Sequence, residues 1–355
     1  MVLSTHARSA VLTGLAVLAT SVLGGCSLTG SSGEEAAEGS DRVVLVTHDS
    51  FALPDELVAD FEERTGLDLE VRPSGDAGTL TNKLVLSKDD PVGDVAFGVD
   101  NTFASRALAE GVFASYAPGL PAGVAAHELP GDDEDLLTPV DTGAVCLNVD
   151  DTWYAERDLT PPRTLEDLTD PAYRDQLVLP GATTSSPGMA FLLTTIARYG
   201  EEWPDYWREL MDNGARLTNG WSDAYQGEFT QGGGAGDRPL VLSYDSSPAF
   251  TVSSGTSTTS ALLDTCFEQV EYAGVLAGAD NPEGAEQVID FLLSDEVQAA
   301  LPESMYVFPV SGQVELPAAW AKHAPRPERT WQVDPAAIDE NRAEWLREWN
   351  DLVAR

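Results

Sequence analysis

The sequence is poor in basic residues. Its 355 residues hold 20 Lys and Arg against 59 Asp and Glu, which gives a formal net charge of −39. A nucleic-acid backbone requires a basic protein face, so this composition excludes nucleic acid as a partner. The acidity is typical of secreted or salt-tolerant proteins that stay soluble, and it favours a cationic small ligand only weakly.

Histidine and cysteine are also scarce. The four histidines are scattered, and no Cys or His spacing resembles a metal site, so we expect neither a metal nor a cofactor. Of the three cysteines, Cys146 and Cys266 lie in the body of the chain. Outside the cytoplasm such a pair is free to form a disulfide, and two buried thiols are the equally open alternative.

The N-terminal apolar segment is shorter than a membrane-spanning helix requires. The apolar run from Val11 to Leu23 follows Arg8, is too short to cross a bilayer, and ends in Leu-Gly-Gly before Cys26. This ending resembles a bacterial lipobox, in which the chain is cut before a cysteine that carries lipid. We therefore expect a signal peptide over 1–25 and a lipidated Cys26 with a flexible tether over 26–41. The alternative is an ordinary signal peptide that contains a cysteine.

Beyond the tether, strand-like and helix-like patterns alternate. Strands are expected at 43–46, 67–71 and 94–97, each followed by a helix, and this order predicts a parallel sheet with helices on both faces. A loop-rich stretch over 118–139 precedes a second α/β set. The strands and helices expected there and beyond are 144–149, 177–179, 187–199, 204–213, 222–229, 240–243, 270–273, 283–293, 296–301 and 335–354. Two such sets predict two lobes and a cleft.

Loops after the strands are the expected ligand site, because open α/β sheets bind ligands at the carboxyl ends of their strands. These loops are rich in hydroxyls, carboxylates and aromatic rings, which suit reversible capture of a polar ligand. They comprise His48 to Ser50, Asp100 and Asn101, Thr184 to Pro187, and Tyr244 to Pro248.

Two Ser-Ser-Pro segments follow strands at expected helix starts. Ser185 and Ser186 precede Pro187, and Ser246 and Ser247 precede Pro248. Serine caps free backbone N–H groups at a helix start, and the same groups with the helix dipole also hold anionic or hydroxyl groups of ligands. A simple cap is the alternative, but two such segments in one lobe favour a ligand role.

Aromatic and acidic residues supply the remaining candidates. Trp221 and Tyr225 stand one turn apart, where they either stack on a flat or cationic ligand or close the core of the lobe. Four carboxylates are candidates to balance a ligand's charge, although each one is also explained as a solvated group or a helix cap. They are Asp49, Asp76, Asp100 and Asp245.

Several segments together are typical of one family. The most telling are Gly-Trp-Ser-Asp-Ala-Tyr at 220–225 and Val-Leu-Ser-Tyr-Asp-Ser-Ser-Pro-Ala at 241–249. The segments at 47–51, 98–101, 185–188 and 308–317 match as well, the first two less specifically. Over nearly its full mature length the chain resembles the thiamine-binding proteins of bacterial thiamine ABC importers.

This resemblance implies an α/β fold of the two-lobed periplasmic-binding-protein type II, with the ligand in the interlobe cleft. Two strands would cross between the lobes, near 141–145 and near 270–272. Lobe 1 would comprise 42–143 and 271–330, lobe 2 would comprise 144–270, and a C-terminal helix would fill 331–355. A monomer is expected, anchored to the cell membrane by lipid, that passes thiamine or a thiamine phosphate to an ABC permease.

The resemblance also implies a set of ligand contacts. In the family an aromatic sandwich holds the pyrimidine ring, and hydroxyls with helix N-termini take the hydroxyethyl or phosphate end. Tyr244 would be one aromatic wall. Where the family has a tryptophan wall, the nearest aromatic residue here is Tyr306, and the register around Asp76 is altered by glycines. The implied contacts are Asp76, Ala77, Ser185, Ser186, Trp221, Tyr244, Asp245, Ser246, Ser247 and Pro248.

Two other functions compete with this interpretation. The same fold with a polyamine or another cationic solute would favour several carboxylates around a linear amine. An extracellular serine hydrolase would need a G-x-S-x-G elbow, but the sequence from Gly220 to Ala224 lacks the last glycine, and no histidine stands in a triad context. We therefore expect a binding protein and not an enzyme.

Overall fold

A computed structural model describes residues 41–354 of the chain. The expected signal peptide, Cys26 and all of the tether except Asp41 lie outside these residues. Within residues 41–354, no helix is long and apolar enough to cross a membrane. The same residues contain no group of three or more His, Cys, Asp or Glu side chains arranged to hold a metal ion.

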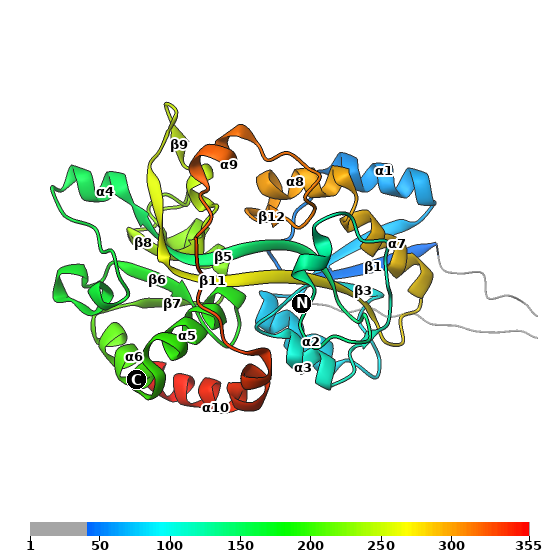
Figure 1. Cartoon of the computed structure of the whole chain (residues 1–355), viewed down its shortest axis with the longest axis horizontal. Helices are drawn as coiled ribbons and strands as arrows, with labels where there is room; N and C mark the ends of the chain where they lie inside the picture. The colour runs from blue at the N-terminus through cyan, green and yellow to red at the C-terminus, as the bar shows by residue number, and fades with distance from the viewer. Residues whose placement is uncertain (1–40, 355) are drawn as a thin grey trace, which may run out of the picture. The chain divides into compact units, whose positions relative to one another are not determined.

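One mixed sheet forms the centre of the described part, with strands in the order β2-β1-β3-β11-β5-β8-β6-β7 (Figure 1). The parallel strands at one end belong to the first lobe, and those at the other end belong to the second lobe. Their bounds are β1 Arg42–Thr47, β2 Asp68–Pro73, β3 Val95–Asp100, β6 Leu177–Pro180, β7 Arg216–Thr218 and β8 Leu240–Tyr244.

Two long antiparallel strands, β5 (Thr138–Asp150) and β11 (Thr259–Leu276), run through both ends of the sheet (Figure 1). Strand β11 pairs with β3 from Glu271 onward, and β5 pairs with β8 from Val145 onward. The partners therefore change at the segments where the crossings were expected. Both strands are much longer than the predicted 144–149 and 270–273. The prediction was too short because buried polar residues interrupt the apolar pattern of these strands.

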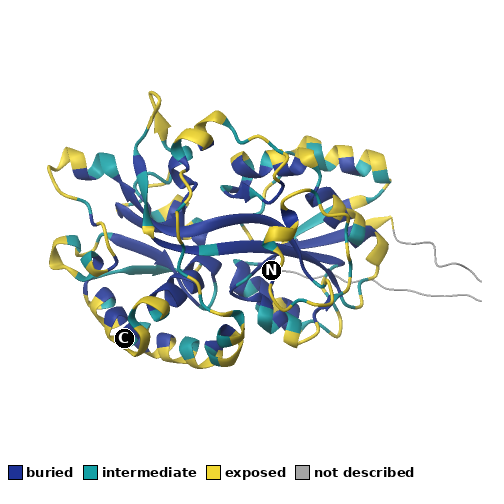
Figure 2. Cartoon of the chain, in the orientation of Figure 1, coloured by how far each residue is buried: buried dark blue, intermediate teal, exposed yellow. Residues whose placement is uncertain are grey.

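Helices cover both faces of the sheet; its central strands are buried, and the edge strands β2 and β7 are only partly buried (Figure 2). Strand β1 shows why its sequence is a continuous apolar run: Val44 and Val46 join one core, and Val43 and Leu45 join the other. The helices are α1 Asp55–Thr65, α2 Ala77–Leu86, α3 Ala104–Ala109, α4 Asp151–Glu156, α5 Ser186–Tyr199, α6 Trp203–Asp212, α7 Pro282–Leu292, α8 Asp295–Met305, α9 Ala318–His323 and α10 Pro335–Val353. Short strands are β4 Phe113–Ala114, β9 Val252–Ser253, β10 Thr256–Ser257 and β12 Phe308–Pro309.

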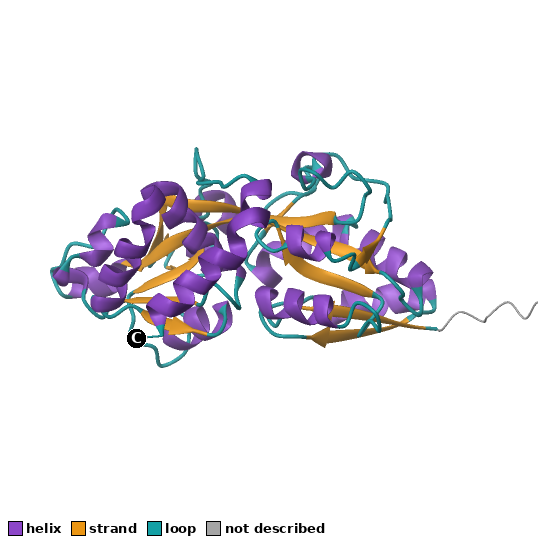
Figure 3. Ribbon diagram, turned by 90° about the horizontal axis from the view of Figure 1, so that it is seen from below, coloured by secondary structure: helices purple, strands orange, loops and turns teal. Residues whose placement is uncertain are grey.

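Seen from below, helices and strands gather in two groups side by side, and the chain ends beside one of them (Figure 3). The C-terminal segment contacts both groups. The Trp331 N–H donates to the carbonyl of Cys266 in β11 at 2.7 Å. In α10, the Arg342 guanidinium lies 4.4 Å from the ring centre of Phe103 beside α3, and Trp349 packs edge-on against Trp207 of α6. Helix α10 therefore contacts the first lobe with one end and the second lobe with the other.

A disulfide joins Cys146 of β5 to Cys266 of β11. Both cysteines are fully buried and pack with Ala144. The bond lies between residues 120 apart in the sequence, so it fixes the two long strands to one another on the second-lobe side of the crossing.

Candidate ligand-binding site

A small cavity, called here the interlobe cavity, lies where the lobes meet. Its volume is about 20 Å³, which is room for about one water molecule. Pockets for small organic ligands are usually several hundred Å³. A heterocyclic ligand therefore requires the lobes to separate. The lining residues are His48, Ser50, Asp76, Glu271, Met305 and Val307 from the first lobe and Ser186, Pro187, Trp221 and Tyr244 from the second.

A second hollow of about 150 Å³, called here the mouth, opens along the same seam. It shares Ser50 and Asp76 with the interlobe cavity. The hydroxyls of Ser50 and Ser222 meet across the seam at 3.0 Å. The remaining lining residues are Asp49, Gly75, Thr79, Asn219, Gly220 and Asp223.

Asp76 ties the two lobes together. Its Oδ1 accepts the N–H of Ala77 at 2.6 Å, which caps α2, and its Oδ2 accepts the N–H of Trp221 from the second lobe at 2.7 Å. Burial raises the pKa of the Asp76 carboxyl, and these two N–H groups act in the opposite direction. The expected contact residue Ala77 does not line the interlobe cavity. Its amide donates to Asp76.

The next two amides of α2 also reach across the seam. The N–H groups of Gly78 and Thr79 both donate to the carbonyl of Thr184, at 3.0 and 3.2 Å. A Cβ on Gly78 would lie 2.7 Å from the Thr183 carbonyl oxygen and 2.8 Å from Phe103. Only glycine allows the lobes to approach this closely at that position.

His48 and Glu271 form the floor of the interlobe cavity and are 6% and 4% exposed. The Ser50 N–H donates to His48 Nδ1 at 3.2 Å, which leaves the proton of a neutral ring on Nε2, 3.5 Å from Glu271 Oε1. Burial lowers the pKa of His48, but nearby Glu271, Asp76 and Asp49 outweigh burial and raise it.

A row of three carboxylates crosses the sheet at this floor. Glu271 of β11 pairs in register with Asp100 of β3 on one side and with Asp141 of β5 on the other. All three are buried. Burial raises the pKa of Asp100 to about 6. Burial and the neighbouring Glu271 raise the pKa of Asp141 well above its usual range. The junction of the lobes therefore gathers carboxyl groups that hold protons more readily than usual.

Aromatic rings form one side of the interlobe cavity. Tyr244 and Trp221 both line it, with ring centres 6.1 Å apart. The Trp221 Nε1–H donates to Ser243 Oγ at 2.9 Å, which fixes the indole. Tyr225 stacks on Trp221 at 5.1 Å, and Tyr306 packs edge-on against Trp221 at 5.4 Å; neither lines the interlobe cavity. They support the rings that do.

Several predicted site residues have local structural roles. Asp100 Oδ1 accepts the N–H and hydroxyl of Thr102, and Asp49 Oδ1 accepts the N–H of Gly75 at the mouth. Asp245 is fully buried, accepts the Ala144 N–H at 3.1 Å and pairs with Arg326 at 3.3 Å. Burial raises the pKa of Asp245 to about 6, while Arg326 acts in the opposite direction.

The two Ser-Ser-Pro segments differ in structure. Ser185 occupies the N-cap of α5 without a side-chain cap, and Ser186 lines the interlobe cavity. The second segment does not begin the helix that was predicted, because Ser247–Ala249 is a single 3₁₀ turn before the β9–β10 hairpin. There the Ser247 hydroxyl meets Ser243 Oγ at 2.8 Å, and the Ser246 hydroxyl donates to the Tyr306 carbonyl.

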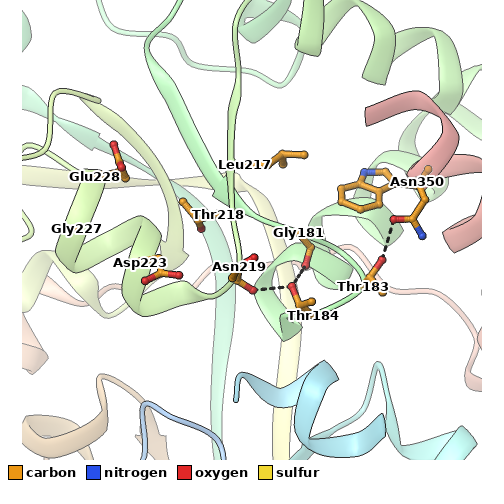
Figure 4. A pocket seen from close by; sticks show the side chains of 11 residues that line it. Gly181, Thr183, Thr184, Leu217, Thr218, Asn219, Asp223, Gly227, Glu228 and Asn350 are labelled. Carbon is orange, nitrogen blue, oxygen red and sulfur yellow. Dashed lines mark hydrogen bonds between the residues drawn. The ribbon is translucent and has the colours of Figure 1, made fainter. Parts of the chain in front are cut away.

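A wider surface hollow of about 570 Å³ lies on the second lobe next to the mouth, with which it shares Asn219 and Asp223 (Figure 4). Of the predicted site loops, only Thr184 contributes to its lining. Its polar groups bind one another: the Thr184 hydroxyl donates to the Asn219 carbonyl at 2.6 Å, and the Thr183 hydroxyl to Asn350 Oδ1 at 3.3 Å. These contacts make it a weaker candidate than the interlobe cavity.

Sequence reasoning placed His48 in a loop expected to form the site but gave it no role of its own, and it missed Glu271. His48 follows directly on the first strand, inside one of the segments that carry the family resemblance, so a signal for it was present. Glu271 lies in the middle of β11, and site residues were sought only in loops at the ends of strands. Met305 and Val307, near the end of α8, carried no signal.

Known proteins resemble this chain over most of its length. A family model described as bacterial extracellular solute-binding protein matches residues 90–341. The thiamine-binding periplasmic protein of Brucella melitensis is 30% identical over 332 residues, covering 90% of this chain and 94% of the relative. That of Escherichia coli is 30% identical over 323 residues, covering 88% and 94%.

Solved structures of periplasmic binding proteins also resemble this chain. A periplasmic thiamin binding protein superposes with a TM-score of 0.76 and 29% identity, covering 88% of this chain and 96% of that chain. A ferric binding protein from Campylobacter jejuni superposes with a TM-score of 0.68 at 17% identity, which shows the fold alone. The fold is that of the type II periplasmic binding proteins. The chain belongs to the bacterial extracellular solute-binding proteins, a family of binding proteins and not of enzymes.

Proposed function

We propose that this protein binds thiamine between its lobes and delivers it to an ABC import permease. The observation that carries the proposal is the lining of the interlobe cavity. Trp221 and Tyr244 offer ring faces, while Asp76 and Glu271 offer negative charge. A flat cationic heterocycle is the ligand that such a set of groups favours. The printed names of the relatives agree with this choice.

Charge at the crossing strands supports a cation further. The row of Asp100, Glu271 and Asp141 brings three carboxyl groups together out of water, and burial with mutual repulsion disfavours ionisation of all three. A cation in the interlobe cavity, which Glu271 lines, would favour the ionised forms of the row. Two aromatic rings in the lining favour thiamine over a polyamine, because a linear amine needs no ring faces.

Calorimetry on protein that begins after Cys26 tests the proposal. We expect thiamine to bind and to raise the thermal midpoint, since a ligand of the folded state shifts the unfolding equilibrium. Spermidine should bind at least tenfold more weakly. The Trp221→Ala variant should lose thiamine affinity, whereas Tyr173→Ala removes a partly exposed second-lobe ring outside the interlobe cavity and serves as a matched control. Absence of heat and of a midpoint shift with thiamine would refute the assignment.

We also propose that Cys26 anchors the protein to the cell membrane through lipid. This rests on the sequence around Cys26, with small residues before the cysteine and a polar tether behind it. Cys26→Ser should move the protein from the membrane fraction to the soluble fraction, with thiamine affinity unchanged. If the variant sediments with membranes as the wild type does, the anchor is not at Cys26.

A further inference from the structure

We infer that α10 braces the ligand-free lobes against separation and that Arg342 is its main positioning residue. The inference goes beyond the proposed function, because it applies to any solute that enters between the lobes. Helix α10 follows both crossing strands in the chain. It therefore makes a connection between the lobes that is separate from β5 and β11.

Three hydrogen bonds to β11 fix the segment that leads into α10. The backbone N–H of Trp331 donates to the Cys266 carbonyl at 2.7 Å, and its Nε1–H donates to the Asp264 carbonyl at 3.1 Å. Gln332 Nε2 donates to Glu268 Oε2 at 2.6 Å. The helix therefore starts from a fixed point beside the crossing strands.

On the first lobe, α10 is held by a contact between Arg342 and Phe103. The guanidinium lies 4.4 Å from the ring centre, and Arg342 is only 6% exposed. Within the described residues, its Nε has no hydrogen-bond acceptor. Burial lowers the pKa of Arg342 to about 10, which shows that this position disfavours the cation. The ring contact is the interaction that favours it there.

On the second lobe, α10 is held by Trp349 and Asn350. The Trp349 ring packs edge-on against Trp207 of α6, with ring centres 5.5 Å apart. Asn350 Oδ1 accepts the hydroxyl of Thr183 at 3.3 Å (Figure 4). Thr183 lies in the loop between β6 and α5, and this loop reaches the seam between the lobes.

The two ends of α10 hold residues that meet at the start of α2. A Cβ on Gly78 would lie 2.7 Å from the Thr183 carbonyl oxygen and 2.8 Å from the Phe103 ring, so one residue of each lobe flanks this glycine. Helix α10 contacts both flanking residues, through Arg342 and Asn350. Because a helix is stiff, lobes that move Phe103 away from Thr183 must break one of these contacts. The helix thus opposes separation of the lobes.

Hydrogen exchange of the ligand-free protein tests the brace. The N–H groups of Gly78 and Thr79 donate to Thr184 across the seam, so their exchange follows separation of the lobes. Arg342→Met keeps an unbranched side chain and removes its charge, and it should speed this exchange about three- to tenfold. Asn350→Ala removes the exposed bond at the other end of α10 and should speed the exchange about twofold.

Arg157→Met is the matched control, because Arg157 lies 4.2 Å from the ring centre of Trp153 within the second lobe. Exchange at Gly78 and Thr79 should keep its wild-type rate in this variant. Arg342→Lys leaves a cation beside the ring and should recover part of the protection. Unchanged exchange in Arg342→Met would overturn the brace. Faster exchange confined to α10 would also overturn it, since the helix would then rest on the lobes without holding them.

The rate of thiamine association supplies a functional readout, and this part of the test rests on the proposed function. Arg342→Met should raise the association rate constant about three- to tenfold, because the ligand enters only when the lobes separate and more molecules are then open. Faster exchange without faster association would overturn the role of the brace in ligand entry. Absence of thiamine binding by the wild type would overturn the proposed function and leave the exchange result standing.

Discussion

Replacing Asp76 by Asn separates two roles that its carboxylate has in the structure. One oxygen caps α2 through the Ala77 N–H, and the other holds the Trp221 N–H across the seam. Asparagine caps helices as well as aspartate does, but its single carbonyl oxygen serves fewer donors and carries no charge. The substitution should therefore keep the helix cap and lose the bond between the lobes.

The size of the effect follows from the kind of bond that is lost. A hydrogen bond to a charged group contributes about 1.5–3 kcal/mol. Burial raises the pKa of Asp76, so desolvation of the carboxylate already offsets part of that gain, and we take the lower end. About 1.5 kcal/mol corresponds to a shift of about tenfold toward separated lobes. The free energy of unfolding should change much less, because each lobe keeps its own core.

Small-angle scattering of the ligand-free protein measures this shift directly. Asp76→Asn should increase the radius of gyration with little change in the thermal midpoint, whereas Asp76→Ala should also lose about 1 kcal/mol from the cap. Asp150→Asn is the matched control, because Asp150 caps α4 and binds Thr230 and Gln231 within the second lobe. Identical scattering from wild type and Asp76→Asn would refute the assignment of Asp76 as an interlobe bond.

Three further predictions concern other parts of the described residues. Tyr244→Ala should weaken thiamine binding at least tenfold, while Tyr244→Phe keeps the ring and loses only the bond from Gln269 Nε2, about 1 kcal/mol; calorimetry on both variants decides whether the ring face binds the ligand. Replacing Cys146 and Cys266 by Ser should lower the free energy of unfolding by about 2–5 kcal/mol in denaturant titrations, and an unchanged midpoint would mean that the disulfide adds nothing. Burial raises the pKa of Asp245 to about 6 from 3.8, so its contribution to stability is present at low pH and is lost as the pH rises through 6. Melting curves should therefore show the wild type gaining more stability than Asp245→Asn between pH 7.5 and pH 5, and parallel curves would contradict the raised pKa.

The architecture of the lobes could be predicted from the sequence because each signal there is local. Val43 to Val46 form an apolar run that only a strand covered on both faces explains, and Gly66 ends α1 in the left-handed conformation. The long strands were underestimated for a physical reason. Thr142 and Gln269 are buried and polar inside β5 and β11, and sequence patterns place such residues in loops.

The site was only partly predictable, because one of its polar residues also lies inside a strand. Loops at strand ends led to His48, Ser186 and Tyr244, and the family resemblance led to Asp76 and Trp221; all five line the interlobe cavity. Glu271 lies in mid-strand, and it reaches the cavity only because β11 passes through the junction of the lobes. The sequence also could not show which carboxylates already accept hydrogen bonds or form ion pairs within the protein. Those partners lie on segments far apart in the chain.

The acidic junction links these observations. Asp100, Glu271 and Asp141 stand in register across three strands, in a place where burial alone makes each charge costly. Ionisation of the whole row is unfavourable unless protons or a cation offset the charge. A cationic solute in the interlobe cavity supplies that charge at the point where β5 and β11 pass between the lobes. Glu271 is the member of the row that lines the interlobe cavity, so it is the group through which a bound cation would offset the charge of the row.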